Sequence, residues 1–434
     1  MKTNVAVAFT EKTHEGAQAA RMNAEQALRR SVMACMLWED EFYEDGQEIG
    51  KRIATLAAGL PFAKVAAVAI EAREKMKLRH APLWLTVALL KAKHQGRMVG
   101  DLVAAVCQRA DEPAELLSMY WKDQKDAPLP KQLKVGLARA LAKFDEYQLA
   151  KYNRDGAVKL RDVLFLSHAK PNTEDRAALY KRIAENQLAT PDTWEVKLSG
   201  GADKKETFLR LMAEKNLGAL AFLRNLRNME QAGVPKTAVA EYGARVDLRR
   251  VLPFRFIAAA NAVPNWEDII EPMIFRALGE RPRFAGHTVL LIDGSASMQM
   301  PVSAKSDISR RDAACALAIM LREICEDVRV ICFSTDPWDI PPRRGFALRD
   351  AINARVIPQY TMLGKAVRYA QQKPTDRIIV ITDEQSADSP PNPNGAGYVI
   401  NVASNKNGIG YGAWTHIDGW SEAVIDYIRS YEAR

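Results

Sequence analysis

The sequence predicts a two-part protein in which residues 1–284 form stacked α-helices and residues 285–434 form an α/β domain with a mainly parallel sheet. Three observations support this division. Apolar residues recur at helical spacing before residue 285, short β-branched runs alternate with helical stretches after it, and the excess of positive charge ends at the same point. A chain of 434 residues is long enough for two or three domains.

Helices account for almost all of the first region. Asn23 and Gln26 have the spacing of a capping box. Helical intervals separate the apolar residues Leu83, Val87 and Leu90. Prolines lie between the helical patterns, as expected because proline is tolerated at the start of a helix and breaks its interior. Many helices without strands favour helix pairs stacked as an α-solenoid, although no fixed-period repeat stands out. Besides the helix that follows Asn23, the predicted helices cover residues 62–78, 82–94, 100–109, 113–122, 131–150, 173–187, 204–215 and 236–249.

Strands and helices alternate in the second region. Short apolar runs without polar alternation are typical of the buried strands of a parallel sheet, which has helices on both faces. Binding sites in this class of fold lie at the carboxyl ends of the strands. The predicted strands are 287–292, 328–333, 377–381 and 398–402, and the predicted helices are 309–326, 361–372 and 420–431.

The excess positive charge is confined to the helical region. The whole chain carries 61 Lys and Arg against 53 Asp and Glu, a formal net charge of +8. Residues 285–434 contain 16 basic and 17 acidic residues, so residues 1–284 contain 45 and 36 and carry a net charge of +9. This distribution indicates a polyanionic partner for the helical region, or else a generally basic protein without one.

Three features limit the class and location of the protein. The sequence has no run of 18 apolar residues, so no membrane span is expected, and its start lacks the apolar segment of a signal peptide. Widely spaced cysteines in apolar surroundings favour buried, reduced thiols and a cytoplasmic location. Neither the cysteines nor the histidines have zinc-binding spacing. The cysteines are Cys35, Cys107, Cys315, Cys325 and Cys332.

The most specific chemical pattern follows the first predicted strand of the second region. Asp293, Ser295 and Ser297 alternate there, so that three oxygen ligands point the same way in an extended turn. Thr361 opens a predicted helix, and Asp383 follows a predicted strand. Hard oxygen ligands without His or Cys suit Mg²⁺ or another divalent cation. The five residues resemble the metal-ion-dependent adhesion site of von Willebrand factor A domains, and the alternative is a serine-rich loop that caps a helix.

Enzymatic chemistry at this site has less support. A serine hydrolase would need a G-x-S-x-G turn and a downstream histidine base, whereas the sequence here is D-G-S-A-S-M and the only later histidine is His416. A phosphatase with Asp293 as the nucleophile would be expected to have a second Asp two residues on. The favoured interpretation is a cation with an open coordination position that a carboxylate of a partner fills. We therefore expect a protein that is not an enzyme.

A basic stretch of the helical region has the composition of a phosphate-binding surface. Residues 122–170 contain 11 basic and 6 acidic residues, with Tyr152 among them. Lys and Arg contact phosphates, His can donate to phosphate or sugar oxygens, and Tyr can stack on a base. The alternative is a solvated helix face with His168 as a cap or core residue. A second basic run, at 224–250, is open to the same two interpretations. The candidate nucleic-acid-binding residues are Arg139, Lys151, Arg154, Arg161, His168 and Lys170.

The sequence resembles the TROVE-domain family, the Ro autoantigen ribonucleoproteins and their bacterial and phage relatives. The resemblance covers nearly the whole chain, and residues 151–171 carry its most distinctive motif. Arg154 matches its counterpart only through a gap, residues 157–159 lack the family's Trp and His, and residues 359–360 replace the Gly pair that often precedes the metal-binding Thr. The other similar motifs are Leu28-Arg-Arg, Leu37-Trp-Glu-Asp, Phe42-Tyr43, Leu78-Arg-His-Ala-Pro-Leu83, Leu223-Arg-Asn-Leu226 and Leu252-Pro-Phe-Arg-Phe256.

The resemblance implies a closed ring of HEAT-like helical repeats, residues 1–284, that carries a von Willebrand factor A-like domain, residues 285–434. It implies that small noncoding Y RNAs bind the outer surface of the ring and that single-stranded ends of misfolded RNAs pass through its central hole. It also implies delivery of RNA to a 3′ exonuclease partner, a monomeric ring and no enzymatic activity. By this match, Lys151, Arg154 and His168 would contact RNA.

Three functional hypotheses follow from these patterns. The first is an RNA-binding scaffold for RNA quality control or processing. The second is a metal-dependent protein-binding module in which the ring is a passive scaffold. The third and least favoured is a metal-dependent nuclease. None of the three involves a membrane partner.

Overall fold

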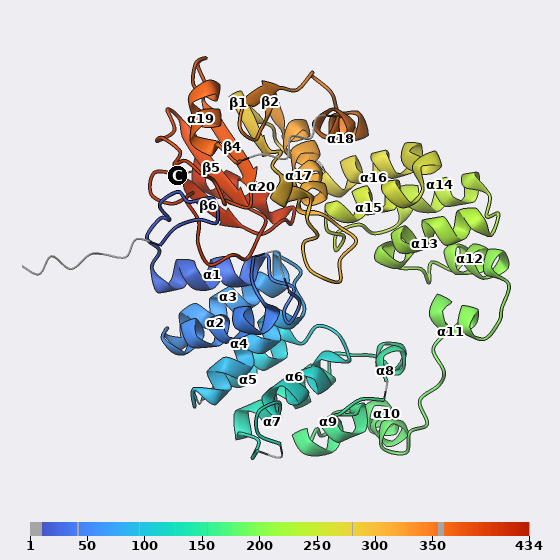
Figure 1. Cartoon of the computed structure of the whole chain (residues 1–434). Helices are drawn as coiled ribbons and strands as arrows, with labels where there is room; N and C mark the ends of the chain where they lie inside the picture. Colours follow the sequence, from blue (N-terminus) through green and yellow to red (C-terminus); the bar gives the residue numbers. More distant parts are fainter. Residues whose placement is uncertain are drawn as a thin grey trace, which may run out of the picture. The chain divides into compact units, whose positions relative to one another are not determined.

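The computed structural model describes residues 11–40, 43–94, 96–125, 127–153, 155–279, 281–354 and 360–433. The chain divides into two compact units. One unit contains residues 50–217, and the other combines residues 1–49 with residues 218–434. Figure 1 shows the elements of both units.

The unit around residues 50–217 consists of short helices stacked in two layers. Helices α5, α7 and α9 pack in sequence to form one layer, and α4 packs on α6 in the other. This pairing of every second helix is typical of helical repeat proteins. A Cβ atom at Gly136 of α7 would lie 2.7 Å from the carbonyl oxygen of Gly100 in α5, so the close approach of these two helices requires glycine. The helices are α2 (Gly46–Ala58), α3 (Phe62–Glu74), α4 (His80–Lys91), α5 (Arg97–Val106), α6 (Glu112–Tyr120), α7 (Lys131–Leu141), α8 (Glu146–Tyr152), α9 (Leu160–Ser167), α10 (Glu174–Ala184), α11 (Trp194–Ser199) and α12 (Lys204–Ala213).

The other unit joins helices from both ends of the chain to a sheet. Helix α13 packs on α15 and α14 packs on α16, and α15 and α16 both contact α17. The helices are α1 (Ala24–Met33), α13 (Ala219–Gln231), α14 (Lys236–Arg245), α15 (Phe254–Ala262), α16 (Glu267–Leu278), α17 (Arg310–Ile324), α18 (Gly345–Asn353), α19 (Leu363–Ala370) and α20 (Ala423–Glu432), with short 3₁₀ helices η1 (Pro264–Trp266) and η2 (Ala296–Gln299). The strands are β1 (Phe284–Asp293), β2 (Cys325–Phe333), β3 (Pro337–Asp339), β4 (Arg377–Thr382), β5 (Ala396–Asn401) and β6 (Thr415–Asp418).

The sheet brings the carboxyl ends of its central strands to one edge. Its strand order is β3-β2-β1-β4-β5-β6, and every neighbouring pair is parallel except β2 and β3. Ile292 of β1 lies opposite Cys332 of β2 on one side and opposite Ile381 of β4 on the other. Val289 and Leu291 of β1 pack in a core cluster with α19, while α17 contacts β1, β2 and β4. Polar residues that follow β1 and β4 therefore lie close together.

The predicted fold class is confirmed, because stacked helices are followed by a mainly parallel sheet. The predicted capping box is present, with Asn23 accepting from the amide of Gln26 at 2.9 Å. The single helix predicted over residues 131–150 is wrong, because α7 ends at Leu141 and Asp145 caps a new helix, α8. Seven described helices were also missed, together with the short edge strands β3 and β6. These helices are α2, α9, α11, α13, α15, α16 and α18.

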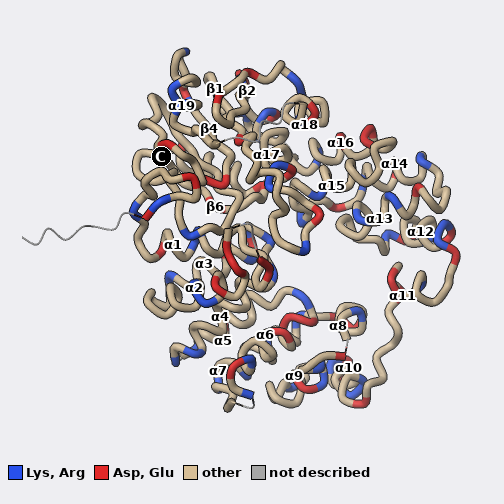
Figure 2. Tube along the Cα trace, viewed as in Figure 1, with Lys and Arg blue, Asp and Glu red and all other residues tan. Residues whose placement is uncertain are grey.

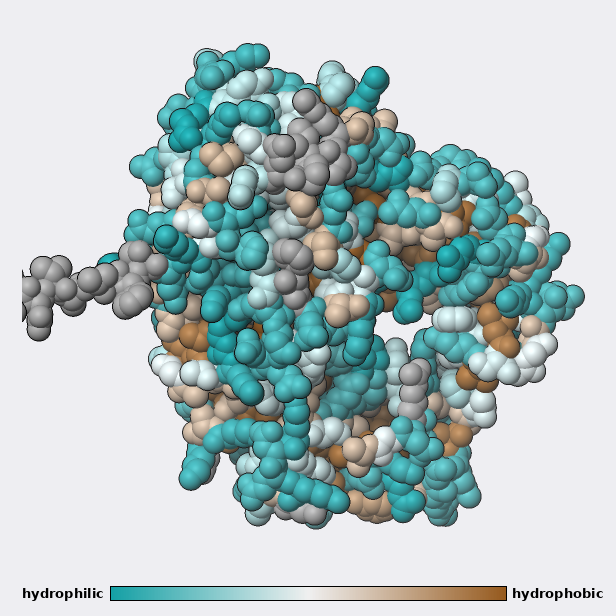
Figure 3. All heavy atoms as spheres, viewed as in Figure 1, coloured by the Kyte–Doolittle hydropathy of each residue, from teal (hydrophilic) through white to brown (hydrophobic). Residues whose placement is uncertain are grey.

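The closure of the helices into a ring and the domain boundary at residue 285 stay predictions. The compact units follow a different division, since residues 1–49 belong with the C-terminal part of the chain. All five cysteines are buried, and none of them forms a disulfide among the described residues. Among the residues that the structure describes, no helix is both long and apolar enough to cross a membrane. In the view of Figure 3 the surface is mostly hydrophilic, with hydrophobic residues scattered over it.

A buried arginine anchors α1 to the α/β part of its unit. The side chain of Arg30 is fully buried and forms an ion pair with Glu384, which follows β4. Its Nε donates to the carbonyl oxygen of Asn405 at 2.6 Å, and its Nη2 donates to that of Asn407 at 2.7 Å. The other side of the Glu384 carboxylate lies 2.7 Å from Nε2 of His416. One carboxylate is thus held between two basic groups in the interior.

The charges in this cluster balance one another. Burial opposes ionisation of His416, but the carboxylates of Glu384 and Asp418 raise the pKa of His416 to about 9. Burial also opposes ionisation of Glu384, but Arg30 and then His416 hold the pKa of Glu384 well below its usual range. Ionised groups of this kind stabilise a protein interior only as a complete set, because a lone buried charge is costly.

The variant Arg30→Met is expected to destabilise the unit that contains the sheet by about 3–5 kcal/mol, because it leaves Glu384 buried beside a single cation. Urea denaturation followed by the fluorescence of the buried Trp414 and Trp420 measures the effect. The control Arg21→Met removes an exposed arginine close to α1 and should leave the transition in place. An Arg30→Met transition that coincides with that of the wild type would contradict the anchoring role.

Candidate nucleic-acid interface and cation site

The predicted basic stretch, residues 122–170, contains helices α7, α8 and α9, and the apolar sides of α8 and α9 share one core. Leu149 of α8 and Leu160 and Leu164 of α9 are buried in a cluster with residues of α10. Helix α9 ends at His168, which adopts the left-handed conformation with φ 52° and remains exposed. His168 is therefore a helix cap and not a core residue. With their apolar sides buried, α8 and α9 direct their charged residues towards solvent.

The structure places most of the candidate basic residues at the surface, and Figure 2 shows Lys and Arg positions along α8, α9 and α10. Lys151 is half-buried, and Arg154 lies outside the described residues. Arg139 lies on α7, and its Nη1 donates to Asp101 at 2.5 Å, so its charge is partly balanced within the protein. The exposed candidates are Arg139, Arg161, His168 and Lys170.

Two exposed aromatic residues, missed in the sequence, lie beside these cations. Tyr147 is 43% exposed, and Nζ of Lys151 lies 6.0 Å from the centre of its ring. Phe165 is 55% exposed, and the guanidinium carbon of Arg161 lies 6.0 Å from its ring. In both pairs the cation and the ring are four residues apart on one helix, which is the spacing that could have indicated them. We call Tyr147, Lys151, Arg161, Phe165 and His168 the α8–α9 surface.

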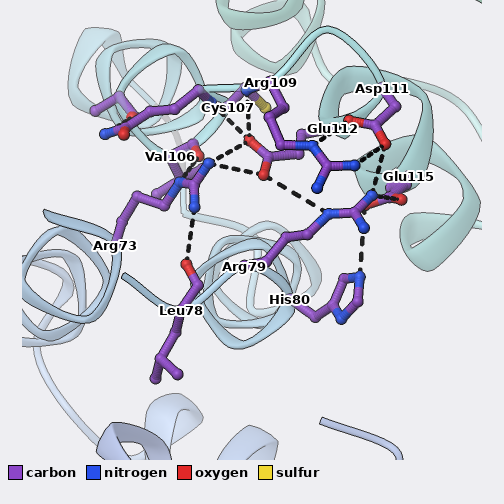
Figure 4. A network of polar contacts seen from close by, with 12 residues as sticks. Arg73, Leu78, Arg79, His80, Val106, Cys107, Arg109, Asp111, Glu112 and Glu115 are labelled. Carbon is purple, nitrogen blue, oxygen red and sulfur yellow. Dashed lines mark hydrogen bonds and ion pairs between the residues drawn. The ribbon is translucent and has the colours of Figure 1, made fainter. Parts of the chain in front are cut away.

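A polar network around Glu112 (Figure 4) contacts α8 through Arg109. Glu112, at the start of α6, is fully buried and accepts from Nη2 of Arg73 at 2.7 and 2.9 Å. It also accepts from the amide of Arg109 at 2.8 Å, and burial raises the pKa of Glu112 despite these donors. The guanidinium of Arg109 lies 4.5 Å from the ring centre of Tyr152 in α8. Arg109 therefore covers one face of Tyr152, the tyrosine expected from sequence to stack on a base.

Three arginines line a separate cavity of about 710 Å³ in the unit that contains the sheet. Arg224 and Arg227 project from α13 and are exposed, and Arg255 projects from α15. Burial, and then the charge of Arg224, lower the pKa of Arg255. Among the described residues, none of these three arginines forms an ion pair with an acid. The cavity is not uniformly basic, since its lining also includes Lys305, Glu39, Asp307 and Asp312.

The predicted cation site begins at the end of β1. Asp293 is fully buried, and its Oδ1 accepts from the amide of Ser295 at 2.9 Å. Its Oδ2 accepts from the hydroxyl of Thr382, the last residue of β4, at 2.6 Å. The hydroxyl oxygens of Ser295 and Ser297 lie 3.1 Å apart. Ser295 precedes the short helix η2 but makes no capping hydrogen bond to it, so the alternative of a serine-rich helix cap lacks its defining contact.

Two further side chains, which the sequence did not indicate, hold the second carboxylate of the site. Oδ2 of the buried Asp383 accepts from Nη1 of Arg310 at 2.9 Å and from the hydroxyl of Tyr43 at 3.3 Å. Burial, and then the charge of Asp383, raise the pKa of Tyr43. Tyr43 also hydrogen-bonds Ser297, which links the loops after β1 and β4. Tyr43 was not indicated because it lies far from both loops in sequence.

The remaining predicted ligand, Thr361, meets an unexpected carboxylate. Its amide donates to Oε2 of Glu15 at 2.5 Å, and its hydroxyl donates to Oε1 at 3.3 Å. Burial raises the pKa of Glu15 to about 7, and the charge of Asp383 adds to the rise while the amide of Thr361 opposes it. Glu15 therefore belongs to the same group of side chains as Asp383.

The structure thus gathers all five predicted ligands around the ends of β1 and β4. Burial, and then the charge of Asp383, raise the pKa of Asp293 to about 7, as expected for two buried carboxylates that face each other. The described residues contain no group of three or more His, Cys, Asp or Glu side chains that could hold a metal, so the hydroxyls are essential to the donor set. Two carboxylates and three hydroxyls fit a hard divalent cation such as Mg²⁺. Such a cation would supply positive charge and an open position for an additional carboxylate.

The fold defines a class of protein, namely stacked helices joined to a mainly parallel six-stranded α/β sheet, and this sheet is consistent with a von Willebrand factor A-like domain. The sequence model of the TROVE domain matches residues 181–273. The fold is similar to that in the crystal structure of the Ro protein (RSR) of Deinococcus radiodurans, with a TM-score of 0.59 and 18% sequence identity over 94% of this chain and 99% of that one. No curated protein sequence matches the chain. The first comparison confirms the predicted resemblance to the TROVE family over residues 181–273, and the second confirms the fold.

The segment matched by the TROVE model does not cover the whole predicted interface. It includes the motifs at 223–226 and 252–256, which contribute Arg224 and Arg255 of the cavity. It does not include residues 151–171, so the assignment of RNA contacts to Lys151, Arg154 and His168 stays a prediction.

Mg²⁺ is expected to raise the melting temperature of the wild-type protein, and Asp293→Asn is expected to abolish this rise. A cation that binds only the folded state stabilises that state. In addition, the buried carboxylate of Asp293 beside Asp383 is costly when no cation is bound. Thermal denaturation with and without Mg²⁺ measures the effect. The control Glu326→Gln removes an exposed carboxylate from β2 and should keep the wild-type response. An equal Mg²⁺-induced rise in Asp293→Asn would argue against this site.

Proposed function

We propose that the chain is an RNA-binding scaffold that binds small structured noncoding RNA of the Y-RNA type and the single-stranded ends of misfolded RNA. The observation that carries this proposal is the α8–α9 surface, where exposed aromatic rings stand beside cations and an exposed histidine. The TROVE match and the likeness to a Ro protein agree with it. The role of such a scaffold would be RNA quality control or processing.

The chemistry of the α8–α9 surface suits RNA with unpaired bases. Lys151 and Arg161 supply positive charge for phosphates, and His168 supplies a hydrogen-bond donor for phosphate or sugar oxygens. Tyr147 and Phe165 expose ring faces on which unpaired bases stack. Residues 122–170, which contain this surface, carry 11 basic against 6 acidic residues, so the local charge also attracts a polyanion.

The arginine-lined cavity is a candidate second contact for a single-stranded end. Arg224, Arg227 and Arg255 offer guanidinium groups that no acid of the described chain neutralises. Arginine presents several donors in a planar fork, which suits phosphate oxygens. The nearby acidic residues would limit how strongly the cavity attracts an RNA backbone.

The rest of the proposal concerns partners and setting. We propose no catalytic role, so RNA incubated with the purified protein and Mg²⁺ should remain intact, and cleavage would favour the nuclease hypothesis. A 3′ exonuclease partner, a monomeric ring and a cytoplasmic location complete the proposal. Buried cysteines that form no disulfide among the described residues are compatible with that location.

A second candidate function, metal-dependent protein binding, is favoured by the cation site alone. A cation held by Asp293 and its neighbours would offer a position for a carboxylate of a protein partner. In that case Asp293→Ala would lose the partner while RNA binding survives. Recovery of the same partners with the variant would exclude this function.

The affinity for a structured RNA with a single-stranded end is expected to fall steeply with salt. For each phosphate neutralised, log K should fall by roughly 0.7–0.9 per unit of log salt concentration. The double variant Lys151→Ala, His168→Ala should bind about tenfold or more weakly and reduce this slope by roughly 1, because it removes contacts to the RNA backbone. Filter binding or fluorescence anisotropy over a series of salt concentrations measures both quantities.

A matched control is Lys406→Ala, which removes an exposed lysine from the near-neutral C-terminal part and should leave affinity and slope unchanged. Absence of binding at low salt, or an unchanged double variant, would refute the RNA-binding proposal.

Phe165→Ala is expected to weaken binding of RNA with unpaired bases by about 1–3 kcal/mol while leaving the salt slope unchanged, because stacking involves no phosphate. Phe165→Leu keeps an apolar side chain without an aromatic ring and should behave like the alanine variant. The ring is more than half exposed, so the melting temperature should stay at the wild-type value. The same comparison with a fully paired RNA duplex should show little change, and full affinity of both variants for the unpaired RNA would exclude stacking at this position.

A further inference from the structure

The arginine-lined cavity gathers cations from two packed helices and a loop. Arg224 and Arg227 are three residues apart on α13, so they lie on one face of that helix. Helix α13 packs on α15, which carries Arg255. Lys305 adds a fourth cation from the loop between η2 and α17. Residues far apart in the sequence therefore line a single volume of about 710 Å³ with positive charge.

The loop that carries Lys305 is closed by contacts of its backbone. Pro301 and Ser309 form an antiparallel bridge at its two ends. The amide of Val302 donates to the carbonyl oxygen of Ile308 at 2.9 Å, one residue further in on each side. The backbone that carries Lys305 is therefore fixed beside the cavity by the fold itself.

The cations of the cavity have no acidic partner within the described part of the chain. Neither the three arginines nor Lys305 forms an ion pair there. The charge of Arg224 acts unfavourably on Arg255 and adds to the effect of burial in lowering the pKa of Arg255. Like charges that the fold holds near each other repel unless negative charge lies between them. A ligand with a high negative charge would remove this repulsion.

The acids of the lining are engaged by neutral donors. Oε2 of Glu39 accepts from the hydroxyl of Ser303 at 2.5 Å. Oδ2 of Asp312 accepts from the amide and the hydroxyl of Ser309, at 2.9 and 2.7 Å, in the capping box of α17. The third acid, Asp307, is exposed. The guanidinium groups of the cavity therefore keep their donors for a ligand.

We propose that the arginine-lined cavity is a phosphomonoester site, and that its ligand is the phosphorylated end of an RNA strand. The inference rests on the proposed function, because it names the chemical group that the cavity would take from a single-stranded end. A phosphomonoester carries a charge of about −1.5 to −2 and three acceptor oxygens, whereas an internal phosphodiester carries a single charge. Guanidinium groups from two helices are able to engage different oxygens of the same terminal phosphate.

The size and the lining of the cavity also suit a terminal nucleotide. Its volume of about 710 Å³ lies within the range of cavities that hold small molecules. Apolar side chains share the lining with the cations, among them the buried Leu223, Ala259 and Ile308. These side chains would contact the sugar or the base of the terminal nucleotide while the arginines hold its phosphate.

Isothermal titration calorimetry of the full-length protein with short oligouridines tests the preference for a phosphorylated end. The probes have equal length and carry a 5′-phosphate, a 3′-phosphate or hydroxyl groups at both ends. One of the phosphorylated probes should bind about tenfold more tightly than the hydroxyl probe, which is the effect of one additional charge-assisted hydrogen bond. The probe that gains affinity identifies the end that enters the cavity.

A double variant tests whether the preference belongs to this cavity. Arg224→Gln, Arg227→Gln removes two exposed guanidinium groups and should abolish the preference for the phosphorylated probe. The control Arg245→Gln, Arg250→Gln makes the same changes at exposed positions outside the lining and should keep the preference. Because all four side chains are exposed, both variants should melt at the wild-type temperature.

The possible failures of this inference and of the proposed function are distinct. Equal affinity of the wild type for all three probes, or a preference that survives in Arg224→Gln, Arg227→Gln, would overturn the phosphomonoester site and leave RNA binding in place. Binding of uridine 5′-monophosphate or 3′-monophosphate without binding of any oligouridine would overturn the RNA end as the source of the phosphate. Absence of binding by every oligouridine and both mononucleotides, together with no binding of structured RNA at low salt, would overturn the site and the proposed function alike.

Discussion

A buried ion pair between Arg30 and Glu384 holds the beginning of the chain against its C-terminal sheet. The two residues are 354 positions apart, and neither charge is exposed, so each is stable in the interior only because the other is present. His416 supplies a second positive group to the same carboxylate. Other contacts of the N-terminal segment, such as that of Thr13 with Ser386, add to this anchor. Both Tyr43 and Glu15, which meet the loops after β1 and β4, belong to that segment.

The turn after β4 directs two consecutive acids to different groups of side chains. Asp383 faces Arg310 and Tyr43 at the cation site, whereas Glu384 faces Arg30 and His416. Glu384 has φ 60°, a left-handed conformation that costs a non-glycine residue about 1–3 kcal/mol. The buried ion pairs offset that cost. The geometry of the cation site and the anchoring of the N-terminal segment therefore depend on one short piece of backbone.

The proposed RNA surface and the cation site lie in different units. The α8–α9 surface belongs to the unit around residues 50–217, while the cation site and the arginine-lined cavity belong to the other. Because they share no residue, a change in one set of side chains leaves the chemistry of the other in place. Of the α8–α9 surface and the arginine-lined cavity, only the α8–α9 surface combines cations with exposed aromatic rings.

Local patterns were enough to predict the fold class and the ends of the strands that carry Asp293 and Asp383. Both follow from local patterns, since periodicity reports which face of an element is buried and parallel strands end at one edge. The sequence also determined that basic residues gather before residue 171. It did not separate α8 from α7, because the cap formed by Asp145 interrupts a pattern that is helical on both sides.

The distant residues that complete the sites can be identified only in the folded chain. Arg30, Glu15 and Tyr43 are single polar residues in an N-terminal stretch, and nothing in their surroundings marks them as partners of residues more than 300 positions away. Phe165 lies on α9 beside buried leucines, and periodicity does not say which apolar residue of a short helix stays exposed. The physical reason is the same for all four residues. Local sequence determines which helix or strand forms and which of its faces is buried. Long-range packing determines which charged groups and aromatic rings come into contact.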